Sequence, residues 1–345
     1  MVFIREPAPP QGERACNTGP IDNIMAVYIV HRIFQGIIVL LCVSLVCFII
    51  FRYTGDPVVM MAGQYATELE RDEIRRAFGL DKPFYVQYFR FISRAAQGDF
   101  GKSYVVKTPA LGLIVERIPA SVELASTAVI LALLLGTGLG VLVSIKPYSL
   151  PSRLIMAGSL AGISIPTFLI GILLIMIFAV TLGWLPPFGR GEVVSLGFWQ
   201  TGFLTRSGLA HLILPALTLT GYQLAVLLRL TRAGMREILA EEFIKTAWAK
   251  GLSPWRVILK HALKNVLIPV ITMSGLMLGE ILAFAVVTET IFQWPGMGNL
   301  LLQSIYNSDQ PVIVTYIMLV AVIILTINIL VDIAYAFLNP KIRYG

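Results

Sequence analysis

Charged residues are scarce in this chain. Asp, Glu, Lys and Arg make up 14% of its 345 residues, whereas a water-soluble chain normally carries about 25%. Cysteine is scarce as well, and Cys16, Cys42 and Cys47 lack the spacing of a metal site or a disulfide framework. We interpret the cysteines as packing residues. The shortage of charge indicates that lipid, rather than water, surrounds much of the fold.

Patterns typical of catalytic sites are missing too. The chain has no HExxH, GxSxG or CxxC pattern. None of His31, His211 and His261 is spaced from a serine or cysteine in a way that suggests catalysis. A channel or an integral membrane enzyme therefore stays open as an alternative of a different class, but no residues support it.

Long apolar runs are what the chain has in abundance. A helix of about 20 apolar residues can cross the hydrocarbon core, where its backbone groups must bond to each other. Two of the runs hold one ionisable residue each, His211 and Glu280. The sequence predicts an all-α integral membrane protein with six transmembrane helices, which are 27–53, 120–146, 154–184, 207–233, 265–288 and 311–338.

The positions of Lys and Arg predict the orientation. With six spans both termini lie on one face, and the short segments there are basic, most of all between Arg229 and Lys264. Short segments on the other face hold only Arg190 and Arg206. Basic short loops remain in the cytoplasm, so both termini are predicted to be cytoplasmic. This topology explains the net charge of +7 without nucleic acid as a partner.

Four of the segments outside the predicted spans carry predictions of their own. We expect residues 1–26 to be a disordered extension, and whether residues 1–24 are expressed stays open. Residues 54–119 are predicted to be extracytoplasmic, and the aromatic face of a helix over 83–96 is expected to pack on the bundle, with the membrane interface or a partner as alternatives. Residues 234–264 form a cytoplasmic loop, and 339–345 a cytoplasmic tail.

The cytoplasmic loop is predicted to fold as helix, turn and helix. Gly251 ends the first helix, and Ser253 and Pro254 are typical of the start of the second. A connection between two spans could be far shorter, so we expect a soluble partner to bind this loop.

Two further features need interpretation. Residues 96–103 (AQGDFGKS) fit a loose phosphate-loop pattern, but no buried strand precedes them and the topology places them outside the cell, so we do not predict nucleotide binding. Glu280 is an acid inside a span, where such groups usually face a cavity or a partner. It is predicted either to line a translocation path or subunit contact, or to be a locally hydrogen-bonded structural group.

The loop sequence EFIKTAWAKGLS over 242–253, followed by KHALKNVLIPV over 260–270, resembles the coupling loop of binding-protein-dependent ABC permeases. It is most similar to the first, B-type subunit of the dipeptide, oligopeptide and nickel branch. Other stretches resemble that branch in the same order, namely GDFGKS (98–103), RIPASVEL (117–124), SIPTF (164–168), LGWLP (182–186), ETIFQWPGMG (289–298) and NPKIR (339–343).

The resemblance implies a type I ABC importer permease fold with an extracytoplasmic helical segment after the first helix. It implies a bacterial inner membrane location and no catalysis or cofactor in this chain. ATP and Mg would be bound by two partner ATPase subunits. A second homologous permease subunit and an extracytoplasmic substrate-binding protein would complete the transporter, and the resemblance leaves open whether the permease pair is homo- or heterodimeric.

The resemblance also implies which residues dock in a cleft of an ATPase subunit. These are Glu242, Thr246, Ala247, Lys250, Gly251, Leu252 and Pro254. The general signature begins Glu-Ala-Ala, where this chain has Lys245, Thr246 and Ala247. No cluster of Met, His and Cys suggests metal handling, so a di- or oligopeptide or a glutathione-like peptide is favoured over nickel. A nickel or opine-type importer of the same family stays the alternative.

Overall fold

The computed structural model describes residues 21–54, 58, 67–77 and 81–338. Residues 21–26 of the extension 1–26, which was expected to be disordered, are helical. The expectations for residues 1–20 and for the tail 339–345 lie outside the described residues. In the described part of the chain, five helices are long and apolar enough to cross a membrane. A bent helix pair makes a sixth span if it is counted as one.

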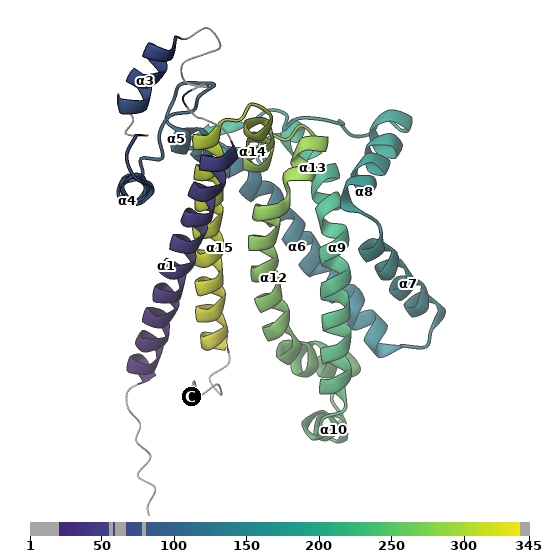
Figure 1. Cartoon of the computed structure of the whole chain (residues 1–345). Helices are drawn as coiled ribbons and strands as arrows, with labels where there is room; N and C mark the ends of the chain where they lie inside the picture. Colours follow the sequence, from purple (N-terminus) through teal and green to yellow (C-terminus); the bar gives the residue numbers. More distant parts are fainter. Residues whose placement is uncertain (1–20, 55–57, 59–66, 78–80, 339–345) are drawn as a thin grey trace, which may run out of the picture.

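The five long helices run side by side, and α1 and α15 lie together at one edge of the bundle (Figure 1). The start of α1 and the end of α15 lie at the same end of the bundle as the short helix α10 (Glu242–Ala249). The long helices are α1 (Ile21–Thr54), α6 (Ile118–Ile145), α9 (Arg206–Leu239), α12 (Lys264–Phe284) and α15 (Gln310–Leu338).

The third predicted span, 154–184, is not a continuous helix. It consists of α7 (Leu150–Ser164), α8 (Thr167–Leu174) and a π-helical turn η1 (Ile175–Thr181), with a bend of 107° between α7 and α8. The break lies at Pro166, and the preceding Ile165 has an extended backbone with ψ of 127°. Proline disfavours helical geometry in the residue before it and removes a backbone donor, so the helix ends there.

Glycines in α6 bring it close to α9. A Cβ atom at Gly136 would lie 3.0 Å from the carbonyl oxygen of Leu224, and one at Gly140 would lie 2.9 Å from that of Leu228. Both obstacles are backbone atoms, which cannot rotate away. The two glycines therefore provide the close helix approach that small residues permit in membrane bundles.

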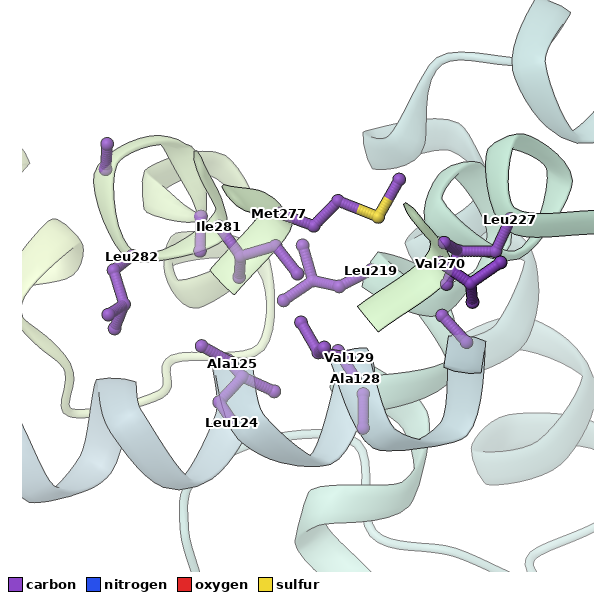
Figure 2. Close-up of a cluster of buried hydrophobic side chains, with 14 of the residues drawn as sticks. Leu124, Ala125, Ala128, Val129, Leu219, Leu227, Val270, Met277, Ile281 and Leu282 are labelled. Carbon is purple, nitrogen blue, oxygen red and sulfur yellow. The ribbon is translucent and has the colours of Figure 1, made fainter. Parts of the chain in front are cut away.

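The core lies where α6, α9 and α12 meet. Side chains from these three helices interlock in Figure 2 and are buried from solvent. They include Leu124, Ala125, Ala128 and Val129 of α6, Leu219 and Leu227 of α9, and Val270, Met277, Ile281 and Leu282 of α12.

Short elements cover the end of the bundle opposite α10 (Figure 1). We call it the far end. An antiparallel hairpin pairs Val194 with Thr201 in the segment between η1 and α9. These short elements are α5 (Ala110–Val115), β1 (Val194–Leu196), β2 (Trp199–Thr201), α13 (Val286–Ile291) and α14 (Met297–Tyr306). Two more helices, α3 (Glu68–Ala77) and α4 (Phe84–Ala95), lie to the side of α1 in Figure 1.

Helix α4 is attached to α1 by aromatic side chains. The Phe48 ring of α1 lies 5.2 Å from that of Phe84 and 5.9 Å from that of Phe91, between ring centroids. Ser44 of α1 and the Tyr88 hydroxyl are hydrogen-bonded at 2.9 Å. The prediction that the aromatic face of this helix packs on the bundle is confirmed, and α1 is the helix that it contacts.

We predict that Gly140→Ala destabilises the chain by about 1–3 kcal/mol, the usual range for overpacking. Its new Cβ would lie 2.6 Å from that of Thr231, so α6 and α9 must separate. Thermal unfolding of the purified protein in detergent measures the effect. The matched control is Gly138→Ala, because a Cβ there meets nothing within 4 Å. Equal melting temperatures for the two variants would contradict the prediction.

Candidate functional site

The loop between α9 and α12 projects beyond the bundle at one end (Figure 1). It consists of α10, a turn at Gly251, the short helix α11 (Pro254–Arg256) and a π-helical turn η2 (Val257–Leu263). We call residues 240–256 the projecting loop. The sequence predicted this helix, turn and helix, and the structure confirms it.

The turn depends on the backbone of Gly251, which has a φ of +72°. The amides of Gly251 and Leu252 donate to the carbonyls of Trp248 and Ala247, which satisfies carbonyls at the end of α10. This is the usual role of glycine after a helix. Pro254 occupies the first turn of α11, and Ser253 precedes it with an extended backbone but makes no side-chain cap bond.

One face of α10 packs on the chain itself. Ile244 is fully buried and Ala247 is 7% exposed, and both belong to the core with Val257 and Ile258 of the following segment. Ala247 was expected to dock on a partner. Its burial makes it instead a residue that holds α10 in place, so it cannot present a surface to another protein. Leu252 is half-buried and also packs against the core.

The opposite face of α10 is exposed. Residues three and four apart share a helix face, so Glu242, Thr246 and Ala249 form one exposed row, and Lys250 follows it. The ion pair between Glu242 and Lys245, at 2.7 Å, lies at the start of this row. The middle of the row carries only small side chains, which would allow close contact with a partner.

Aromatic side chains border this exposed row. Phe243 and Trp248 of α10 are 45% and 43% exposed, and Trp255 beyond the turn is 62% exposed. Exposed apolar groups rimmed by polar ones mark contact surfaces, and tryptophan is common among residues that dominate binding. These aromatics and Ala249 were missed from sequence. A helical wheel of 242–249 could have found them, because Ile244 and Ala247 define the buried side.

Glu280 lies on the exposed surface of α12. It makes no hydrogen bond or ion pair with any residue that the structure describes. The interpretation as a locally hydrogen-bonded group therefore gains no support. Exposure on a membrane helix fits the other interpretation, in which Glu280 faces a path or another subunit.

At the far end, the start of α6 holds a buried ion pair. The Arg190 guanidinium donates to Glu123 at 2.7 Å and to the carbonyl of Gln200 at 2.6 Å. The two charged side chains are only 8% and 2% exposed. The amide of Gly202 also donates to Glu123, at 3.3 Å. These bonds attach the loop that carries the hairpin to α6.

A second buried carboxylate lies beside this pair. The Ser121 hydroxyl donates to Glu289 at 2.6 Å, and the amide of Asn299 donates to it at 3.0 Å. Burial raises the pKa of Glu289, and the hydrogen bond from Ser121 is the main opposing effect. A Cβ at Gly296 would overlap the Glu289 carboxylate, so a larger residue there would displace this carboxylate from its hydrogen bonds.

Tryptophan links the two carboxylate sites. The Trp294 indole donates to the carbonyl of Ala120 at 2.9 Å, and Arg190 lies 6.0 Å from the centre of the Trp294 ring. We call Ser121, Glu123, Arg190, Glu289 and Trp294 the far-end polar cluster. All its members except Arg190 fall in the motifs 117–124 and 289–298. These motifs were recognised in the sequence, but their contact with each other could not be predicted from it.

The phosphate-loop pattern has a structural role in this fold. The hydroxyl of Ser103 donates to the carboxylate of Asp309, which precedes α15, and the amide of Tyr104 donates to the same carboxylate at 2.9 Å. Burial, and then the charge of Asp309, raise the pKa of Tyr104 to about 12. Ser103 thus attaches the segment before α5 to the start of α15.

Comparisons with family models cover most of the chain. Residues 136–344 match the binding-protein-dependent transport system inner membrane component. Residues 25–125 match the N-terminal model of the same transport system membrane component.

Curated relatives are similar over nearly their whole length. The chain is 39% identical over 318 residues to the glutathione transport system permease protein GsiC of Escherichia coli K12, covering 92% of this chain and 99% of that one. It is 41% identical over 316 residues to the di/tripeptide transport system permease protein DppB of Pseudomonas aeruginosa, covering 88% and 94%. It is 39% identical over 322 residues to the oligopeptide transport system permease protein AppB of Bacillus subtilis, covering 93% and 100%.

A solved structure supports the fold. An inward-facing form of the MetNI methionine ABC transporter aligns with a TM-score of 0.53 and 16% identity, covering 66% of this chain and 97% of that one. At this identity the likeness concerns the fold alone.

We predict that Arg190→Met destabilises the chain by about 3–5 kcal/mol, because it leaves the Glu123 carboxylate buried without a partner. Replacing both residues, as Glu123→Leu with Arg190→Met, removes both charges and should recover most of the loss. Melting temperatures in detergent measure both effects. Arg206→Met is the control, because Arg206 is exposed. A double variant as unstable as the single one would contradict this account.

Proposed function

This chain belongs to the family of binding-protein-dependent transport system inner membrane components. From that premise we propose that it is the permease subunit of an ATP-driven importer of peptides. The observation that carries the proposal is the projecting loop at one end of a membrane bundle. Its exposed row of small residues between aromatic side chains has the form of a docking surface. Nothing else about a connection between two spans requires such a surface.

We infer that the projecting loop lies in the cytoplasm together with both ends of the chain. The segment from Arg229 to Lys264, which contains the projecting loop, is basic, and basic short loops are retained on the cytoplasmic side. The start of α1 and the end of α15 lie at the same end of the bundle. The far-end polar cluster then lies on the extracytoplasmic side, where a soluble binding protein would deliver substrate.

The proposed partner of the projecting loop is an ATPase subunit. Thr246 and Ala249 would lie against it, and Phe243 and Trp248 would fill pockets on either side. Gly251, Lys250 and Pro254 would form the end of the contact. Two such ATPase subunits, a second permease subunit and an extracytoplasmic binding protein complete the proposed assembly.

Peptides are the substrates we propose. The three relatives described above are named for glutathione, di/tripeptide and oligopeptide transport. A nickel or opine importer of the same family is the alternative. In either case ATP and Mg would be bound by the partner subunits, and closure of the ATPase pair would rotate the two permease bundles between inward- and outward-facing states.

We predict that Ala249→Arg uncouples transport. Ala249 lies on the exposed row of α10, and Arg is as good a helix former as most residues, so the chain itself should fold normally. The long side chain would keep the ATPase subunit away. Substrate-stimulated ATPase activity of the reconstituted transporter should fall to the basal rate.

Gln97→Arg is the control, because it introduces the same arginine side chain at an exposed position just after α4, outside the projecting loop. It should leave the stimulation unchanged. Gly251→Arg should also uncouple, as the family resemblance predicts, but its φ of +72° adds backbone strain. Normal substrate stimulation of the ATPase activity in the Ala249→Arg variant would contradict the proposed docking surface.

We predict that the reconstituted transporter takes up labelled di- and tripeptides when the binding protein and ATP are present. Uptake should stop when ATP hydrolysis is blocked, because the permease itself supplies no energy. The same vesicles should be tested with nickel and with an opine. Uptake of nickel but not peptide would favour the alternative substrate, and ion conductance by the purified chain alone would favour a channel.

A further inference from the structure

Helix α4 lies beside α1 at membrane depth. The apolar span of α1 is Val30–Ile50, and the Tyr88 hydroxyl of α4 donates to the carbonyl of Leu41 within it at 3.1 Å. At 1.5 Å per residue, Leu41 lies about 13 Å before the end of the span, whereas Phe48, which three rings of α4 contact, lies only about 3 Å before it. The body of α4 is therefore near the end of the span, and the Tyr88 hydroxyl reaches deeper. In Figure 1 α4 is seen nearly end-on where α1 is seen lengthwise, so α4 crosses α1.

The two flanks of α4 differ in chemistry. Tyr85 and Phe89 lie four residues apart on one flank and are 62% and 69% exposed. Arg90 and Arg94, also four residues apart, lie on the other flank and are exposed. The face between the flanks is the aromatic one that contacts α1. A helix held in this way directs apolar and cationic side chains to opposite sides.

The charge of α4 is entirely positive. Its sequence FYVQYFRFISRA holds two arginines and no acid. Neither guanidinium makes a hydrogen bond or ion pair with a residue in the described part of the chain. Arginine near a membrane surface extends its charge toward the headgroups while its stem stays in apolar surroundings. Tyrosine is likewise enriched at that depth.

We propose that α4 is an interfacial helix that binds anionic phospholipid. Tyr85 and Phe89 insert among the acyl chains, and Arg90 and Arg94 bind headgroup phosphates. The depth of the contact with α1 and the absence of acids favour lipid over a protein partner. The assignment of α4 to the outer leaflet rests on the proposed function. The depth of α4 in the membrane does not depend on the proposed function.

A spin label at Phe89 tests the depth. In the assembled transporter in vesicles, with the three native cysteines replaced by alanine, a nitroxide on Phe89→Cys should contact oxygen far more than a water-soluble nickel chelate. Val39→Cys, 56% exposed within the span of α1, is the lipid reference, and Phe198→Cys, 90% exposed in the hairpin turn, is the water reference.

Three results would overturn or redirect the proposal. Exposure of the Phe89 label to the nickel chelate would place α4 in water and overturn it. A label shielded from both reagents would indicate a protein partner and overturn it as well. If the Val39 label is also open to the chelate, α1 does not span the membrane and the proposed function fails instead.

Arg90→Gln with Arg94→Gln tests the headgroup contact. Each arginine near an anionic surface should raise phosphatidylglycerol binding about fivefold. The enrichment of phosphatidylglycerol over phosphatidylcholine around the purified transporter, measured by mass spectrometry, should therefore fall in the double variant. Arg76→Gln is the control, because it removes an exposed arginine from α3 instead. Unchanged enrichment in the double variant would overturn the lipid-binding role.

Discussion

Helices α6 and α9 approach so closely at Gly136 and Gly140 that their backbones face each other without side chains between them. In lipid no hydrophobic effect drives two apolar helices together, so such packing supplies the attraction instead. Both the far-end polar cluster and the projecting loop depend on this packing. The far-end polar cluster is built on the first turns of α6, and α9 continues to the projecting loop. If α6 and α9 separated, the far-end polar cluster and the projecting loop would lose their fixed positions relative to each other.

The far end shows why buried polar residues occur in a chain so poor in charge. Loops that cross the ends of a membrane bundle carry backbone groups that the apolar core cannot satisfy. Glu123 accepts from Arg190 and from the amide of Gly202, and Glu289 accepts from Ser121 and the amide of Asn299. Each carboxylate thereby fixes a separate segment to the start of α6. The charges hold loops in place, and the stability of the bundle itself comes from the apolar contacts of Figure 2.

Much of this architecture could be predicted because lipid imposes length and polarity on each span. The turn at Gly251 could be predicted as well, since few residues other than glycine adopt its backbone conformation. The break at Pro166 was underestimated because proline is often tolerated in membrane helices, as Pro215 and Pro269 are within α9 and α12. The pairing of Glu123 with Arg190 could not be predicted, because it depends on where a loop returns to a helix. The burial of Ala247 was missed for a similar reason, since the segment that covers it follows it in the chain.

Helix α9 connects the far-end polar cluster to the projecting loop. This helix of 34 residues begins beside Gly202, which is bonded to Glu123, and ends at the projecting loop. At 1.5 Å per residue it is about 50 Å long. Between these ends, α6 packs against α9 at both glycines. Ile244 and Ala247 of α10 are buried in the same core. Continuous packing therefore connects the projecting loop, α9, α6 and the far-end loops, whereas the neighbouring span is interrupted by its bend at Pro166.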